Sequence, residues 1–151
     1  MYTHILVAVD GSDPSKQALA EAIRLARQQS AQLKLIHVVD QTLRVFEERG
    51  WLGNEAMQKT LLKATSDAGV KILEDAVQVC QAAGITAQTE MPKIISESIG
   101  DKILTEAEQW PADLIVIGTH GRRGIQKVML GSVAEAVAKR ATVPVMLIRA
   151  K

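Results

Sequence analysis

The sequence predicts one α/β domain over residues 1–151, built on a five-stranded parallel sheet with helices on both faces. Three observations predict this fold. Five short runs rich in β-branched residues alternate with helical segments, and repeated β-α-β units need right-handed crossovers that make the strands parallel. The first run is apolar at nearly every position, as in a strand covered on both faces. A chain of 151 residues also suits a single continuous core.

The first part of the chain supplies two strands and a helix. The strands are expected from His4 to Val9 and from Leu33 to Val39, because both runs are short and rich in branched side chains. The helix between them opens at Asp13 as its N-cap, with Pro14 at the first helical position. Its apolar stripe consists of Leu19, Ala22, Ile23 and Ala26.

An irregular segment from Asp40 to Gly53 follows and carries the aromatic residues Phe46 and Trp51. Two interpretations of these rings stay open: they tuck back over the sheet edge, or they belong to a lid or partner surface. A long helix is then expected from Asn54 to Ala83, with Gly84 as a left-handed cap. The apolar face of this helix would consist of Leu61, Ala64, Ala68, Ile72, Ala76, Val79 and Ala83.

The remaining elements continue the alternation. A strand is expected from Ile85 to Met91, a helix from Ser96 to Gln109 and a strand from Asp113 to Ile117. The last helix spans Ser132 to Arg140 and the last strand Val143 to Ile148. We expect the strand order 3-2-1-4-5, which reverses direction between the first and the fourth strand. Parallel sheets bind ligands at the carboxyl ends of their strands at such a point.

A glycine motif follows the fourth strand at this point. Gly118 and Gly121 are followed, nine residues later, by Gly131 and Ser132 at the start of the last helix. Glycine lets backbone N–H groups approach an anion, and a helix start adds unpaired donors and a partial positive charge. Strand, glycine loop and helix start together predict a phosphate site for a nucleotide. The sequence contains neither a Walker A string nor the three-glycine dinucleotide fingerprint.

Composition limits the classes of partner, the cysteine chemistry and the cellular location that we expect. A net charge of +1 gives no bulk attraction to nucleic acid or anionic membranes. Cys80 is the one cysteine, so neither an intrachain disulfide nor a cysteine metal cluster is possible, and inert core packing is expected for it. No apolar run approaches the ~18 residues of a membrane-spanning helix. The first ten residues indicate a strand and not a leader peptide, so we expect a cytoplasmic protein.

The pattern Gly-x2-Gly-x9-Gly-Ser resembles the universal stress protein family, and within it the ATP-binding branch. The flanking strands carry the resemblance over essentially the whole chain. They are Val-Ala-Val-Asp10-Gly-Ser, Ile36-His-Val-Val39, Asp113-Leu-Ile-Val-Ile-Gly118 and Val143-Pro-Val-Met-Leu-Ile148. The resemblance implies a Rossmann-like fold of the adenine nucleotide alpha hydrolase type. It also implies ATP as the ligand, with Mg²⁺ or Mn²⁺ as an optional companion.

The resemblance also implies a role for particular positions. Ala8, Asp10 and Val38 would line the adenine and ribose side, and Gly118 would approach the ribose. The phosphates would be held by Gly121, Arg122, Gly131, Ser132 and Val133. Replacing Gly118 or Gly131 by valine is expected to abolish binding while leaving the protein folded.

Simpler roles compete with these assignments. Gly118 and Gly121 are also typical of a turn in a long β–α connection, and Ser132 of an N-cap. Asp10 could cap the next turn instead of contacting ligand or Mg²⁺. His120 lacks an identifiable nucleophile and base partner, so we expect no catalytic role for it.

Three functions stay open, of which a binder comes first. It would be a nucleotide-dependent regulator in the stress response, acting through dimer or partner contacts. The second is a slow ATPase or autophosphorylating protein, with Asp10 on Mg²⁺ and Ser132 or Thr119 as phosphate acceptor; the sequence shows no acid suited to a Walker B role. The third is a nucleotide-free scaffold. The resemblance further implies a homodimer through the last strand, Val143 to Ile148, whose Pro144 suits a sheet edge.

Overall fold

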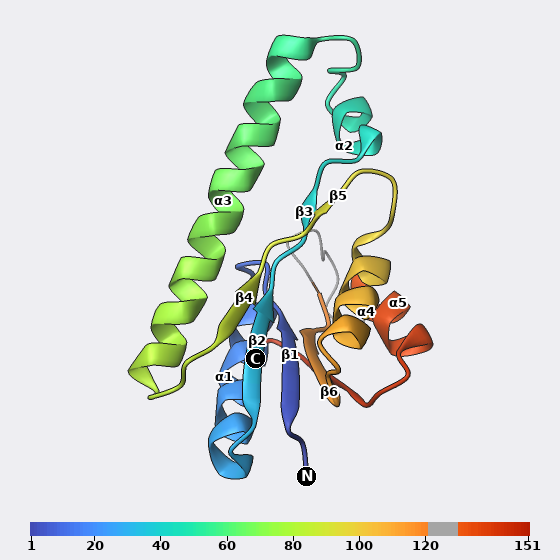
Figure 1. The fold of residues 1–151 in the computed structure, drawn as a ribbon. Helices are drawn as coiled ribbons and strands as arrows, with labels where there is room; N and C mark the ends of the chain where they lie inside the picture. Colours follow the sequence, from blue (N-terminus) through green and yellow to red (C-terminus); the bar gives the residue numbers. More distant parts are fainter. Residues whose placement is uncertain (121–129) are drawn as a thin grey trace.

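The computed structural model, which describes residues 1–120 and 130–151, is an α/β domain with the expected five-stranded parallel sheet. The strands lie side by side in the order β4-β2-β1-β6-β7 (Figure 1). Their bounds are Gln88–Glu90 for β4, Gln32–Ile36 for β2, His4–Ala8 for β1, Leu114–Gly118 for β6 and Val145–Ile148 for β7. Within this sheet, the order is that expected for five strands.

One detail of the topology differs from the expected one. Two further strands, β3 (Val39–Asp40) and β5 (Lys93–Ile94), pair in parallel as a separate small sheet. They lie beyond the carboxyl ends of β2 and β4 (Figure 1). The expected second strand, Leu33 to Val39, is therefore two strands, and the expected third strand, Ile85 to Met91, is reduced to β4.

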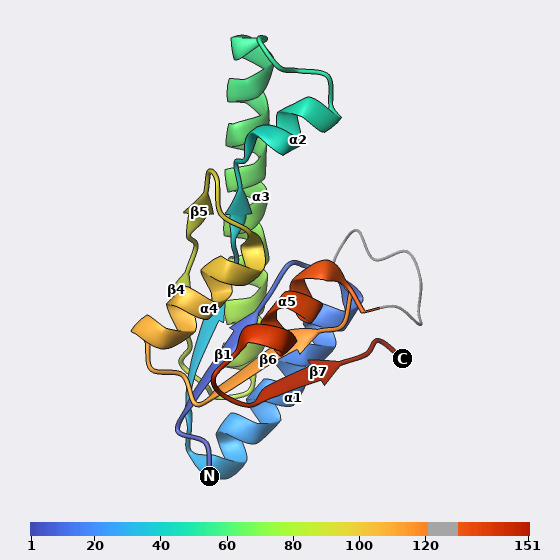
Figure 2. The same cartoon turned by 90° about the vertical axis from the view of Figure 1, so that its right-hand side faces the viewer.

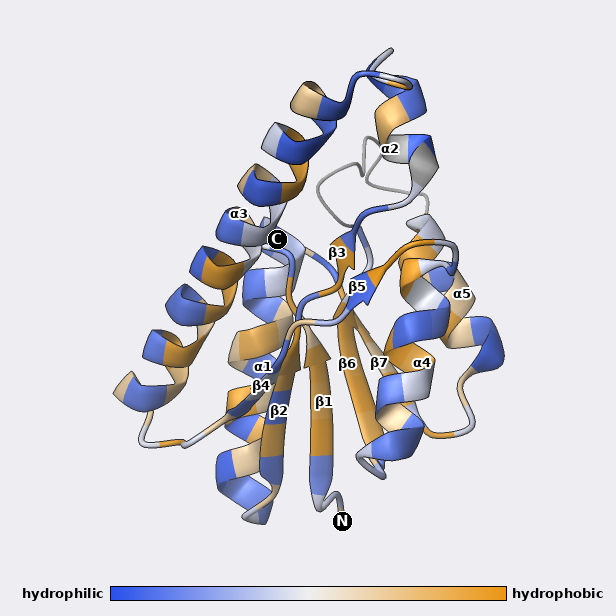
Figure 3. Cartoon of the chain, turned by 45° about the horizontal axis from the view of Figure 1, so that its top comes forward, coloured by the Kyte–Doolittle hydropathy of each residue, from blue (hydrophilic) through white to orange (hydrophobic). Residues whose placement is uncertain are grey.

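Helices cover both faces of the sheet (Figures 1 and 2). α1 (Asp13–Gln29) and α3 (Glu55–Ala82) pack on one face, and α4 (Ile99–Gln109) and α5 (Ser132–Arg140) pack on the other. The apolar strands between them stand out in Figure 3. In β1, Ile5 and Val7 face α1 and α3 while Leu6 faces α4 and α5, and all three are fully buried. Burial on both sides explains why this run is continuously apolar.

The start of α1 corrects one prediction. Its N-cap is Ser12, whose Oγ accepts a hydrogen bond from Ser15 N at 3.3 Å. Asp13 is instead the first helical residue, where its charge favours the positive end of the helix dipole. Pro14 lies in the first turn, and the expected apolar stripe of α1 is buried.

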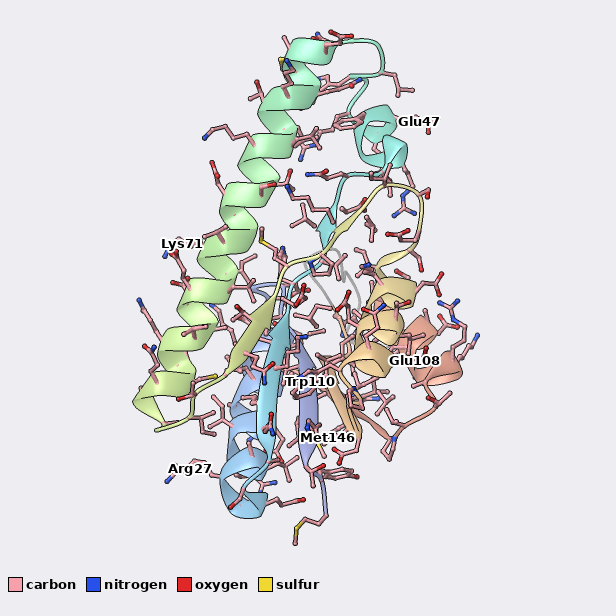
Figure 4. The ribbon with its side chains drawn as sticks, viewed as in Figure 1. Arg27, Glu47, Lys71, Glu108, Trp110 and Met146 are labelled. Carbon is pink, nitrogen blue, oxygen red and sulfur yellow. The ribbon has the colours of Figure 1, made fainter. Side chains whose placement is uncertain are left out.

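α3 begins and ends where expected, but it is rotated about its axis. The side chain of Asn54 accepts from Met57 N at 3.2 Å at the start of the helix, and Gly84 follows its end at φ +77°. The buried residues are Gly69, Leu73, Ala76 and Cys80. Of the predicted face, Ala76 is buried and Ile72 and Ala83 pack against the core cluster. The buried residues Gly69, Leu73 and Cys80 each lie one position after a predicted one, which is about 100° around the helix. Lys71 points away from the sheet, on the outer side of α3 (Figure 4).

The segment between Asp40 and Gly53 is not wholly irregular, because it contains the short helix α2 (Leu43–Glu48). Phe46 is 5% exposed, so its ring is part of the packed interior. Trp51 is half-buried, with the guanidinium of Arg49 5.5 Å from its ring centroid. Phe46 belongs to neither core cluster that covers the sheet, so its burial does not place the ring over the sheet edge.

Candidate functional site

The candidate site lies where β1 and β6 end side by side. The two strands are parallel neighbours, with Ile5 opposite Leu114 and Val7 opposite Val116. β2 follows on one side of β1 and β7 on the other side of β6, so the strand order reverses between these two strands. Their carboxyl ends therefore open onto the same edge of the sheet (Figure 3).

The tail of β1 forms a tight hydrogen-bonded turn into α1. Asp10 Oδ1 accepts from Ser12 N at 2.9 Å and from Ser12 Oγ at 2.5 Å. Gly11, between them, has φ +80°, a conformation that favours glycine. Asp10 N donates to Ser15 Oγ at 2.9 Å. One carboxylate oxygen of Asp10 thus has the turn-capping role that was one of its two predicted roles.

Ser15 is a residue that the sequence argument did not single out. It is 4% exposed, and its Oγ links the tail of β1 to the first turn of α1. The available signal was a serine on the buried side of a helix start, three positions after the capping serine. Such a residue needs a polar partner when it is buried.

Gly118 is the last residue of β6 and not part of a turn. A methyl group added there would lie 2.7 Å from Pro14 Cβ and 2.9 Å from the Pro14 carbonyl carbon. The absence of a side chain therefore lets β6 pack directly against the start of α1. This role is independent of any ligand.

Backbone hydrogen bonds connect Thr119, which precedes residues 121–129, to the part of the chain that follows them. Thr119 N donates to Ile148 O at 2.8 Å, and Gly131 N donates to Thr119 O at 2.7 Å. These bonds bring the start of α5 next to the end of β6. Gly121 and Arg122, also assigned to the site, lie outside the described residues.

The start of α5 has no side-chain cap. Gly131 is the N-cap in an extended conformation (φ −63°, ψ 154°), and no side chain of the described residues bonds to the N–H groups of the first turn. Ser132 is therefore the first helical residue and not the N-cap, and it is exposed. A helix start leaves the N–H groups of its first residues without intrahelical partners, and such groups attract anions.

The other predicted residues share one apolar patch. Val38 belongs to the cluster between the sheet and α4 and α5, and Ala8 and Val133 pack against it. Ala8 and Val133 are half-buried, and Val38 is 9% exposed. The structure thus places an apolar surface next to the polar turn and the helix start.

His120 lies between the first two glycines of the motif. Its Nδ1 is 3.0 Å from Thr119 Oγ1, and Thr119 is 5% exposed. Its Nε2 is buried and has no hydrogen-bond partner among the described residues. The described part of the chain also contains no group of three His, Cys, Asp or Glu residues arranged to hold a metal ion.

Two ionisable groups with shifted pKa values lie away from this edge. Burial opposes ionisation of Asp113, but hydrogen bonds from the Thr3 hydroxyl and from the backbone N–H groups of His4 and Thr3 lower the pKa of its carboxyl group. This cluster fixes the amino end of β1, opposite the site. Burial raises the pKa of the Cys80 thiol, which agrees with the inert packing expected for it.

Comparisons with known proteins point to one family. The model of the universal stress protein family matches residues 1–149. Universal stress protein YxiE of Bacillus subtilis is 32% identical over 151 residues, which covers 99% of this chain and 100% of that protein. Within the described residues, no helix is long and apolar enough to cross a membrane.

Solved structures show the same fold. The universal stress protein UspA from Lactobacillus plantarum superposes with a TM-score of 0.80 at 28% identity, covering 98% of both chains. The universal stress protein from Archaeoglobus fulgidus in complex with dAMP gives a TM-score of 0.68 at 25% identity, covering 97% of this chain and 98% of the other. A universal stress protein in complex with cAMP gives 0.66 at 25% identity, covering 99% and 98%.

Proposed function

The chain belongs to the universal stress protein family, and we propose that it binds an adenine nucleotide, with ATP as the physiological ligand, at the carboxyl edge of β1 and β6. Its nucleotide state would then bias a dimer or partner surface, as expected of a cytoplasmic regulator in the stress response. Solved relatives that hold dAMP and cAMP support an adenine nucleotide as the ligand class.

The observation that carries this proposal is the uncapped start of α5 beside the end of β6. Within residues 1–120 and 130–151, no side chain caps the first turn of α5, and a bond from Gly131 N to Thr119 O holds this turn next to β6. A phosphate group would accept hydrogen bonds from the N–H groups there and would meet the positive end of the helix dipole. In this arrangement Gly131, Ser132 and Val133 contact the phosphates.

The remaining residues fit the rest of the nucleotide. Ala8 and Val38 supply apolar contact for the adenine ring, and the backbone of Gly118 at the end of β6 approaches the ribose. Asp10 supplies a carboxylate near the ribose, although one of its oxygens is engaged by Ser12. Gly121 and Arg122 complete the phosphate side in this proposal.

A slow phosphoryl-transfer activity is the second candidate function. Its two candidate phosphate acceptors, Thr119 and Ser132, differ in how far they are buried. Thr119 is 5% exposed and its Oγ1 lies 3.0 Å from His120 Nδ1, so it is a poor acceptor. Ser132 is exposed at the helix start. If autophosphorylation occurs, Ser132 is therefore the acceptor that we propose.

The test changes single donors at the start of α5. Proline is favourable at the first position of a helix, and the extended conformation of Gly131 suits a residue that precedes proline. Ser132→Pro should therefore keep the helix while removing one N–H and one hydroxyl. Loss of charge-assisted hydrogen bonds worth ~1.5–3 kcal/mol predicts affinity for ATP weakened by about tenfold or more in calorimetric titration.

Ser132→Ala is the matched control, because it removes the hydroxyl and keeps the N–H. We expect a smaller loss of affinity for this variant and unchanged melting temperatures for both ligand-free variants. Mass spectrometry of nucleotide released from the native wild-type protein identifies what it holds. Recovered ATP favours the binder, whereas ATP converted to ADP over hours with Mg²⁺ favours the enzyme. A wild-type protein that neither retains nor binds nucleotide contradicts the proposal.

A further inference from the structure

The backbone pairing between β1 and β2 stops within the candidate site, between Ala8 and Asp10. Ala8 and Ile36 are the last paired residues, and Val9 N still donates to Ile36 O at 2.9 Å. Beyond Ile36 the segment that follows β2 no longer bonds to the tail of β1 through its backbone, and its N–H groups donate instead to the segment around β4 and β5. His37 N donates to Glu90 O at 3.1 Å, and Val39 N donates to Pro92 O at 2.8 Å. The tails of β1 and β2 therefore separate at this point.

The side chain of His37 bridges the two tails where the backbone ladder ends. Its Nδ1 lies 2.8 Å from the carbonyl oxygen of Val9. A carbonyl oxygen can only accept a hydrogen bond, so Nδ1 carries the proton and donates it. Val9 is 5% exposed, and its carbonyl would otherwise be a buried acceptor facing the gap between the tails.

Helix α3 holds the imidazole from behind. A methyl group added at Gly69 would lie 2.8 Å from His37 Cδ2, 3.2 Å from His37 Nε2 and 3.0 Å from Met91 Sδ. Gly69 is buried in the interior of a 28-residue helix, where glycine is otherwise unfavourable. The close approach of α3 leaves the ring little room to rotate away from Val9.

From these contacts we infer that His37 is a positioning residue that fixes the spacing between the tails of β1 and β2. The residue after Val9 is Asp10 and the residue after His37 is Val38, which are the two sides assigned above to ribose and adenine. One hydrogen bond thus sets the distance between the polar and the apolar wall of the site. This inference rests on the proposed function and adds a residue that would not touch the nucleotide.

The test compares side chains that keep or remove the donor. His37→Asn places an amide N–H near the position of Nδ1, and His37→Leu fills similar space without a donor. His4→Leu is the matched control, because His4 is a half-buried histidine at the opposite end of the neighbouring strand β1. Affinity for ATP would be measured by calorimetric titration, and stability by thermal unfolding of the ligand-free proteins.

We expect His37→Leu to weaken ATP affinity by about tenfold and His37→Asn to stay within about threefold of wild type. His4→Leu should leave affinity unchanged at a comparable loss of stability. If His37→Leu does not fold, Gly69→Ala replaces it, because its added methyl group displaces the ring and should weaken binding in the same way.

Other results would overturn the inference. One is wild-type affinity in His37→Leu. Another is equal loss in the leucine and asparagine variants, which would mean that a hydrogen-bond donor at this position does not set the affinity. In both cases nucleotide binding by the wild type leaves the proposed function standing. A wild-type protein that binds no nucleotide overturns both.

Discussion

At the residue scale, Gly118 shows that a residue predicted to bind a ligand can also be needed for packing. Gly118 belongs to the glycine motif that predicts a phosphate site, yet its contact with Pro14 gives it a role in the ligand-free protein. The expectation that Gly118→Val would leave the protein folded is therefore withdrawn. The start of α5 offers the cleaner place to test binding.

The contact at Gly118 predicts a stability effect. In Gly118→Ala the new methyl group would lie 2.7 Å from Pro14 Cβ and 2.9 Å from backbone, so β6 or α1 must shift. Overpacking of this kind predicts a loss of about 1–3 kcal/mol in the free energy of unfolding, measured by urea denaturation without nucleotide. Gly131→Ser is the control, because its φ of −63° suits any residue and serine is a good N-cap. Equal stability of Gly118→Ala and wild type would contradict the packing argument.

At this scale the sequence predicted which residues lie at this edge of the sheet better than it predicted the contacts that each one makes. Asp10, Gly118 and Ser132 could be identified because polar or glycine residues directly follow strands or open a helix. Their contacts could not, since the interactions of Ser12 with Asp10 and of Pro14 with Gly118 exist only once the chain has folded. The same holds for the bond from Gly131 N to Thr119 O beside Ser132. The same reason hid His37, which in sequence is one polar residue inside an apolar run.

At the element scale, local signals placed helices more accurately than strands. α5 has the predicted bounds because an apolar period and a glycine before its first residue are local signals. The second strand was predicted to be too long because its apolar run continues to Val39. The strand ends where His37 N and Val39 N donate to the carbonyl oxygens of Glu90 and Pro92. These acceptors lie about fifty residues further along the chain. The rotation of α3 has a similar origin, because several alanines carry little information about which face is buried.

Because Ser12 and not Asp13 is the N-cap of α1, the two residues should contribute differently to stability. Ser12→Ala removes the N-cap bond to Ser15 N and the hydroxyl that donates to Asp10. Loss of an N-cap predicts about 1 kcal/mol less free energy of unfolding. Asp13→Ala should cost less, because Asp13 contributes only its charge at the helix start. Urea denaturation of both variants decides the assignment, and a larger loss for Asp13→Ala would favour the original one.

At the scale of the whole molecule, the open question is what covers the free edge of the sheet. β7 is an edge strand, paired only with β6 in the described part of the chain. All four of its residues are apolar and at least partly exposed, with Leu147 at 37%. An apolar edge of this kind invites pairing with another strand. We propose that a second copy pairs with it antiparallel, as the family resemblance implies.

Charge on this edge should prevent such pairing. Leu147→Lys places an ammonium group where a partner strand would lie, which is a common way in which proteins block their edges. We expect sedimentation velocity to show a dimer for wild type and a monomer, or a dimer dissociating at about tenfold higher concentration, for the variant. Val79→Lys is the control, because Val79 is an exposed apolar residue on α3 at 49%. If the edge also transmits nucleotide state, ATP should change the dimer dissociation constant of wild type and of Val79→Lys by the same factor. A dimer that Leu147→Lys leaves intact would place the interface elsewhere.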